Sequence, residues 1–175
     1  DLNSLELNFD IYEVDPWHFY LQVDNSGTDN RKWNPRFGVI NTNVTGRDDR
    51  ISLLWQGPVF RDNWIEPFED NYTIFGSYEF PLFTPRLRLN MYIGHSRFEI
   101  GAGDTGGIAS FRGNGDYWGG MLRYNLFQMP GEWFFDILAG LSQEYSRVTT
   151  TVGGIFDIPA DVEMNLLHTG FELHR

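Results

Sequence analysis

WHFYLQVDNSGTDNRKWNPRFGVINTNVTGRDDRISLLWQ, residues 17–56, is the stretch that decides the fold. At its start apolar and polar side chains alternate strictly, which is typical of a β-strand with one apolar and one wet face. Residues 25–30 then supply a turn, because glycine and asparagine tolerate positive φ angles. A second strand is expected around residues 36–44 and a third at 50–56, joined by a tight turn at 45–49. The stretch therefore predicts consecutive antiparallel hairpins.

The rest of the chain repeats this pattern. The further strands are expected at residues 71–82, 86–94, 116–129, 133–144 and 167–174. Short turns are expected at 83–85 and 130–132. Long loops are expected at 95–115, with strand extensions, and at 149–161. About eight strands with alternately short and long connections predict an all-β fold, an antiparallel up-and-down transmembrane β-barrel that is part of a larger barrel.

The composition supports a membrane barrel. Six Trp, eight Tyr and fifteen Phe exceed what a small soluble core needs, and aromatic girdles at both membrane interfaces account for them. No run approaches 18 apolar residues, which excludes a membrane-spanning helix. The net charge of −11 argues against nucleic acid as a partner, because phosphates require Lys and Arg patches. The absence of cysteine argues against a disulfide scaffold.

Two short motifs carry a family resemblance: Asp24-Asn25-Ser26-Gly27 closes a strand, and Gly46-Arg47-Asp48-Asp49 precedes one. They resemble the first barrel hairpins of the hemolysin secretion/activation family, the TpsB transporters of two-partner secretion, within the BamA-type outer-membrane superfamily. Residues 78–82 resemble the strand end that follows in that family. The resemblance implies a protein of the bacterial outer membrane that exports an unfolded partner protein through its polar lumen without ATP. It also implies a sixteen-stranded barrel, of which this chain is the N-terminal half.

The resemblance divides the chain into two parts. Residues 1–15 are expected to be the last strand of a periplasmic POTRA domain, or alternatively the first barrel strand, and 16–175 are the barrel segment. The family's Val-Arg-Gly-Tyr lid motif is not found, and residues 111–114 are only superficially similar to it. Either the chain stops before that loop, or the branch of the superfamily is wrong. The expected partners are outer-membrane lipid, a secreted protein, and further barrel strands from the same or another chain.

The polar residues that alternate with the apolar ones are expected to face the lumen. The candidates are Glu79, Arg88, Asn90, Arg123, Asn125, Asp136 and Glu144. A polar wall of this kind would not bind the apolar side chains of a passing polypeptide. Opposite charges on neighbouring strands also help to fix the register of the strands.

No pattern in the sequence indicates catalysis, a metal or a cofactor. Residues 101–106 match G-x-G-x-x-G, but more glycines follow where a dinucleotide site needs a helix. The four histidines have no second ligand at a metal-type spacing. Ser96 beside His95 is a neighbour pair without a nucleophile elbow. We therefore expect no catalytic, metal or cofactor residues and no intrinsic enzymatic activity.

Two alternatives stay open. One is a complete eight-stranded outer-membrane barrel with an adhesion, lipid-binding, lipid-modifying or structural role, whose interior is filled by side chains. The terminus at residues 172–175, which lacks the aromatic residue typical of finished barrels, argues against it. The other is a soluble ligand-binding β-barrel, which would place the apolar faces inward. The environment of the apolar faces separates this alternative from a membrane barrel.

Overall fold

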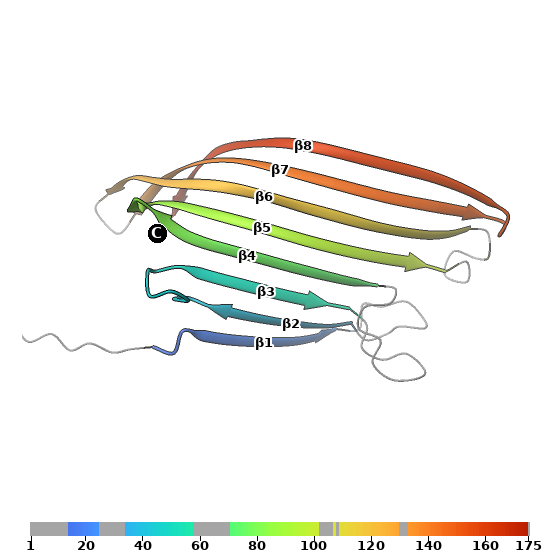
Figure 1. The fold of residues 1–175 in the computed structure, drawn as a ribbon, viewed down its shortest axis with the longest axis horizontal. Coiled ribbons are helices and arrows are strands. Elements are labelled where there is room, and N and C mark those ends of the chain that lie inside the picture. Colours follow the sequence, from blue (N-terminus) through green and yellow to red (C-terminus); the bar gives the residue numbers. More distant parts are fainter. Residues whose placement is uncertain are drawn as a thin grey trace, which may run out of the picture.

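The computed structural model describes residues 14–24, 34–57, 71–101, 107, 109–129 and 133–174, and these form one antiparallel sheet (Figure 1). Its strands are β1 (Trp17–Asp24), β2 (Asn34–Asn41), β3 (Arg50–Gln56), β4 (Tyr72–Leu82), β5 (Thr84–Ile100), β6 (Ala109–Met129), β7 (Trp133–Val152) and β8 (Phe156–His174). Each strand pairs with the next along the chain, so the topology is an up-and-down meander. This confirms the prediction of an all-β antiparallel fold. Among the described residues, no helix is long and apolar enough to cross a membrane.

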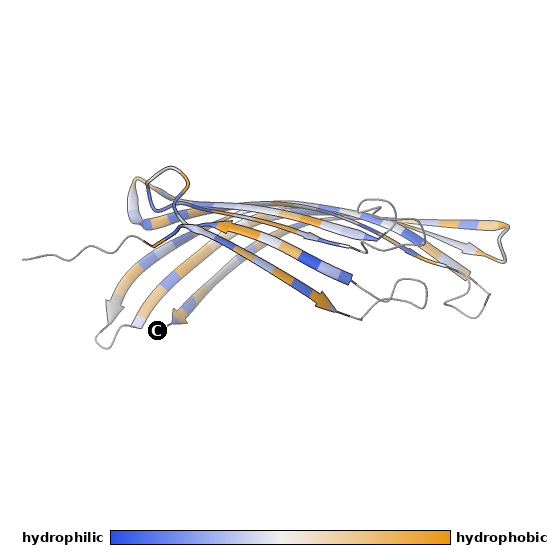
Figure 2. Cartoon of the chain, turned by 90° about the horizontal axis from the view of Figure 1, so that it is seen from below, coloured by the Kyte–Doolittle hydropathy of each residue, from blue (hydrophilic) through white to orange (hydrophobic). Residues whose placement is uncertain are grey.

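The strand register assigns every side chain to one of two faces, because direct cross-strand partners point to the same side. One face holds the even-numbered residues of β1, β2, β3, β5, β7 and β8 and the odd-numbered ones of β4 and of β6 up to Asn125. The sheet is arched, as Figure 2 shows, and we call this side the concave face. The opposite side is the convex face.

The convex face is apolar on all eight strands in the half of the sheet that carries the short turns. Its residues include Trp17, Phe19, Leu21, Val23, Phe37, Leu53, Ile74, Leu89, Met91, Ile93, Trp118, Leu122, Ile137, Leu141, Leu167, Phe171 and Leu173. We call this surface the apolar band. Leu141 is 66% exposed and Phe171 76%, and none of the described hydrophobic residues is buried. The sheet therefore presents its apolar side chains outward instead of enclosing them in a core.

The apolar band ends within two neighbouring rows of the sheet, at Ile93 and Trp118 on β5 and β6 and at Leu141 and Leu167 on β7 and β8. Ile93 and Trp118 are the last apolar pair, and the next pair on this face is His95 and Asp116. The part of β5 to β8 beyond these rows is the distal extension, which projects past β1 to β4 in Figure 1. Its convex face is polar, and its concave face carries apolar residues. The latter are Phe98, Ile100, Phe111, Val148, Val152, Phe156, Ile158, Val162, Met164 and Leu166.

Glycines on the concave face receive aromatic rings from the neighbouring strand. Tyr20 lies directly across from Gly38, Tyr92 from Gly119 and Tyr117 from Gly94. A Cβ at any of these glycines would collide with the ring opposite, within 2.6 Å of the Tyr92 hydroxyl in the case of Gly119. A ring that fits only over glycine fixes the pairing of the two strands, as in designed sheets where aromatic residues cover glycines.

The strands of the distal extension are longer than predicted. The loop predicted at 149–161 is wrong, because β7 continues to Val152 and β8 begins at Phe156. Gly153 and Gly154 have φ angles of 61° and 68°, and the Val152 carbonyl accepts a hydrogen bond from the Ile155 amide at 3.3 Å. Positive φ at both central residues is the signature of a type I′ hairpin turn. Most of the polar residues that suggested a loop, Thr149, Thr151, Asp157 and Asp161, lie on the polar convex face of these strands.

Some predicted features lie outside the described residues. The POTRA-like strand at 1–15 is described only from Val14 onward, and the turn residues Asn25, Ser26 and Gly27 and the stretch 102–106 are not described. Asp24 is the last residue of β1. The second strand ends at Asn41 instead of Val44.

Candidate functional site

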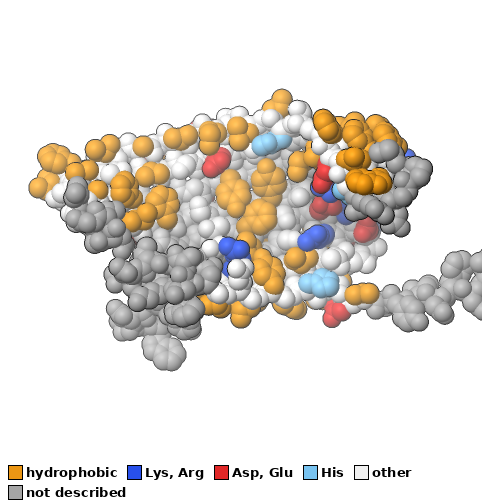
Figure 3. All heavy atoms as spheres, turned by 180° about the vertical axis from the view of Figure 1, so that it is seen from behind, with side chains coloured by type: hydrophobic (Ala, Val, Ile, Leu, Met, Phe, Trp, Pro, Cys, Tyr) orange, Lys and Arg blue, Asp and Glu red, His pale blue; other side chains and the backbone are white. Residues whose placement is uncertain are grey.

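All seven predicted lumen residues lie on the concave face, which Figure 3 shows with charged and histidine side chains among apolar ones. Six of them gather near the end with the short turns, while Glu144 lies opposite Tyr117, farther along β7. The six divide into two clusters, one around Arg88 and one around Asp136. Arg88 and Arg123 lie directly across from each other, a like-charge pair that costs stability unless each is neutralised.

The Arg88 cluster joins β4, β5 and the loop at residues 42–49. The Arg88 guanidinium contacts a Glu79 carboxylate oxygen at 2.5 Å, an Asp48 carboxylate oxygen at 2.6 Å and the Asp48 carbonyl at 2.7 Å. Such charge-assisted contacts from a planar guanidinium are stronger and more directional than neutral hydrogen bonds. Asp48 is in the loop that precedes β3. To contact Arg88 on β5, this loop passes over the end of β4, which lies between β3 and β5. Nearby, the Asn90 side-chain oxygen is buried without a hydrogen-bond partner among the described residues.

The two predicted turn residues in this loop that the structure describes, Gly46 and Asp49, have structural roles. Gly46 has a φ angle of 79°, which favours glycine. Asp49 is only 1% exposed and accepts hydrogen bonds from the Tyr78 hydroxyl at 2.6 Å and the Thr45 amide at 2.9 Å. Burial alone would raise the pKa of the Asp49 carboxyl, but these hydrogen bonds outweigh it and hold the pKa below its usual value. The carboxylate therefore anchors the loop to β4.

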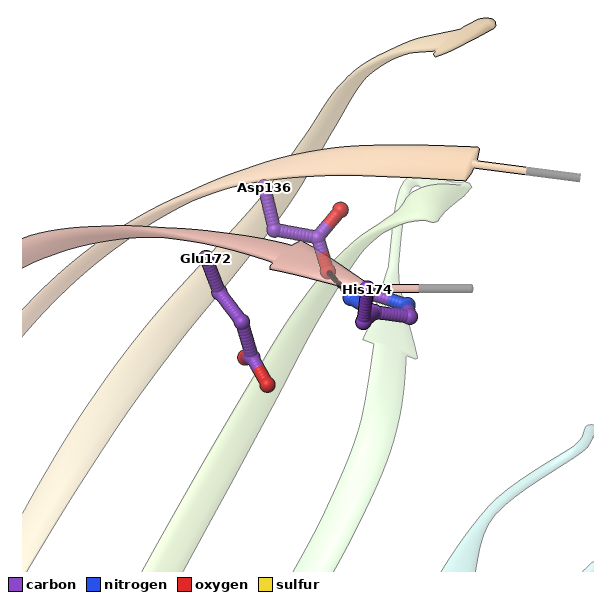
Figure 4. A group of neighbouring side chains, drawn as sticks. All are labelled: Asp136, Glu172 and His174. Carbon is purple, nitrogen blue, oxygen red and sulfur yellow. Dashed lines mark ion pairs between the residues drawn. The ribbon is translucent and has the colours of Figure 1, made fainter. Parts of the chain in front are cut away.

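The Asp136 cluster joins β6, β7 and β8 (Figure 4). Asp136 is 3% exposed and accepts a hydrogen bond from the Asn125 amide at 2.6 Å. The Arg123 guanidinium lies 3.9 Å from the Asp136 carboxylate and 3.4 Å from that of Glu172. The His174 Nδ1 atom lies 4.0 Å from the Asp136 carboxylate. Arg123 thus has carboxylates on the side away from Arg88, and the two arginines tolerate their close approach.

Sequence reasoning missed this group, since its members lie on separate strands that only the register brings together. Asp136, Glu172 and His174 offer ligand atoms that all lie within 4.8 Å of one another, a spacing that a metal ion would accept. Arg123, however, already supplies a cation to both carboxylates. We therefore interpret the group as an ion-pair network that ties three strands together.

The structure places the side chains of the neighbours His95 and Ser96 on different faces of the sheet. His95 points to the convex face, where its Nδ1 atom lies 2.6 Å from an Asp116 carboxylate oxygen. Ser96 points to the concave face. The two side chains lie on opposite sides of the sheet and do not form a nucleophile–base pair.

No family model, curated protein or solved structure matches this chain. The resemblance to the TpsB transporters therefore stays a prediction from the sequence.

Proposed function

We propose that the sheet is part of the wall of a β-barrel in the bacterial outer membrane, whose polar lumen exports an unfolded partner protein. The apolar band faces hydrocarbon, and the concave face lines the lumen. The observation that carries this proposal is the change of the convex face from apolar to polar within two neighbouring rows across β5 to β8. The row of Ile93 and Trp118 continues with Gln143 and Asn165, and the next row is His95, Asp116, Tyr145 and Glu163. A soluble sheet that packs on a partner has no reason to end its apolar surface at nearly the same level on four strands.

The height of the apolar band supports a membrane location. On β7 it runs from Trp133 to Leu141, about 9 residues or roughly 30 Å of extended strand. At the strand tilt of about 40° found in membrane barrels, this gives a height of roughly 23 Å, close to the ~25 Å band of outer-membrane proteins. Trp118 and Trp133 lie near the two borders of the band, where the aromatic girdles of such proteins are found.

The charge arrangement of the concave face suits a conduit. Within the band this face carries charged groups that largely satisfy one another, such as Arg88 with Glu79 and Arg123 with Glu172. Ion-paired side chains keep the lumen wall hydrated. Because each charge is already neutralised by its partner, none is left to bind a passing polypeptide.

The edges of the sheet favour a larger barrel over a closed eight-stranded one. In the described part of the chain, β1 pairs only with β2 and β8 only with β7. Hydrocarbon does not tolerate unpaired backbone groups, so both edges require further strands. β1 has 8 residues and β8 has 19, so pairing the two with each other would still leave much of β8 uncovered.

Accessibility of single cysteines tests the membrane part of this proposal. The chain has no cysteine, and Leu89 and Asn90 point to the convex and concave faces. In lipid vesicles, a cysteine at 90 should react with a small water-soluble maleimide. A label at 89 should instead be quenched by a quencher attached to the lipid tails. Aqueous labelling at 89 together with lipid quenching at 90 would show that the faces are assigned the wrong way round.

Conductance tests the conduit. The complete barrel, with the further strands that both edges require, should conduct ions in a planar bilayer, and Glu79→Gln should shift its ion selectivity away from cations. Leu89→Gln, a change on the opposite face, is the matched control and should leave selectivity unchanged. A correctly inserted protein with no measurable conductance would contradict the proposed lumen while leaving the membrane location in place.

A further inference from the structure

A cavity of about 290 Å³ lies on the convex face of the distal extension. Three arginines line it, namely Arg97 on β5, Arg112 on β6 and Arg147 on β7, together with His95 and Asn114. No carboxylate is among the described residues that line it. This is notable in a chain of net charge −11 that has only 13 Lys and Arg residues. Guanidinium groups that converge on a cavity without carboxylates favour an anion.

The acidic residues of this region hold the arginines from outside the cavity. Glu99 contacts Arg112 at 3.2 Å and Asp161 contacts Arg147 at 3.6 Å. The Arg147 guanidinium also donates to the Tyr145 hydroxyl at 2.7 Å. These contacts fix the direction of two of the three guanidinium groups. Arg97 has no ion pair with any residue in the described ranges, so its charge is available to a ligand.

The cavity lies just beyond the border of the apolar band. Arg97 is on the same strand and face as Ile93, about 13 Å farther along and so roughly 10 Å above the band at a tilt near 40°. The headgroup region of a bilayer adds about 5–8 Å on each side of the hydrocarbon, and an arginine side chain extends over a similar distance. The three guanidinium groups therefore lie at the level of lipid headgroups and on the face that meets them.

We infer that this cavity binds the phosphate group of a membrane lipid headgroup. This inference rests on the proposed membrane location, because that location brings the phosphate of a lipid to this face. A phosphate monoester offers three acceptor oxygens and a charge near −2, which match several guanidinium donors better than a zwitterionic headgroup does. The site would select phosphorylated lipids of the leaflet at the distal end of the sheet.

Binding of defined lipids to the purified protein tests the inference. In detergent, native mass spectrometry with phosphatidic acid, phosphatidylcholine or inorganic phosphate should show a preference for phosphatidic acid. Arg97→Gln should weaken that binding by about 5- to 20-fold, the loss of one charge-assisted contact at an exposed site. Arg97→Lys, which keeps the charge, should retain most of it. Arg50→Gln, the same charge loss on the concave face, is the matched control and should have no effect.

Three outcomes would overturn the inference. The first is equal binding of phosphatidic acid and phosphatidylcholine. The second is binding that Arg97→Gln does not change. The third is inorganic phosphate that binds as tightly as the lipid, which would identify a site for the free ion. Failure here is distinguishable from failure of the proposed function, because the cysteine labels at 89 and 90 do not involve these arginines.

Discussion

Leu89→Arg tests the apolar band most directly. Leu89 lies on the convex face between Phe80 on β4 and Leu122 on β6. It is four residues from Ile93, about 13 Å along the strand and so roughly 10 Å below the distal border of the band. In a band about 25 Å high this is close to the midplane, where a cation costs about 2–4 kcal/mol. The ratio of folded to unfolded protein should fall roughly 30- to 900-fold.

Unfolding by urea in lipid vesicles, followed by tryptophan fluorescence, measures this change. Asn90→Arg is the control, since position 90 faces the proposed lumen directly across from Glu79 and should cost less than about 0.5 kcal/mol. In water the convex face of the described sheet is exposed, so a cation there would cost little. Equal and small effects of the two substitutions would therefore refute the assignment of this face to hydrocarbon.

Three further substitutions test the contacts that hold the sheet together. Asp136→Ala leaves Arg123 and Asn125 without their buried acceptor and should cost about 1–3 kcal/mol in urea unfolding, whereas Asp136→Asn should cost less. Gly94→Ala should destabilise by about 1–3 kcal/mol, because its Cβ meets the Tyr117 ring, and Tyr117→Ala in the same chain should recover part of the loss. The pKa of Asp49 is lowered in the folded protein. The stabilisation that its carboxylate gives the folded state is therefore present above about pH 4 and is lost as the pH falls through the pKa of the folded protein. Asp49→Asn should therefore lower stability at pH 7 and weaken its decline in acid, as pH-dependent thermal unfolding would show; an unchanged acid profile would contradict this.

The alternation of side chains was enough to predict the faces of the strands but not their ends. The alternation around Leu89 assigned that residue and Asn90 to opposite faces, and the register agrees. The loop predicted at residues 149–161 was wrong because polar residues were read as a sign of a turn. In this segment they instead alternate with Ile158 and Val162 on a strand whose faces have exchanged polarity. Only the two glycines at 153 and 154 mark the turn itself.

The polar clusters were predictable as residues and not as contacts. The alternation placed Arg123 and Asp136 among the lumen candidates, and the structure brings them together. Glu172 and His174 were not among the candidates, because their proximity to Asp136 depends on the pairing Asp136↔Glu172 between β7 and β8. A shift of the register by one residue would move these side chains to the other face. No local property of the sequence fixes that register, and the aromatic rings that cover glycines lie between β1 and β2 and between β5 and β6, not between β7 and β8.

The unequal strand lengths and the exchange of polarity have one physical explanation. Strands β1 to β4 have 7 to 11 residues, close to the 9–11 that a tilted strand needs to cross a bilayer, while β5 to β8 have 17 to 21. The surplus lies at the end opposite the connections at residues 83 and 130–132. At the proposed membrane location, the polar convex face of this end would meet water and headgroups instead of hydrocarbon. In outer-membrane barrels the shorter connections are periplasmic, and three of the four connections at the distal end are long, at residues 25–33, 57–71 and 101–108. The distal extension and its arginine-lined cavity would therefore face the outer leaflet. The same orientation leaves the Arg88 and Asp136 clusters near the periplasmic mouth, where an unfolded partner would first meet the wall.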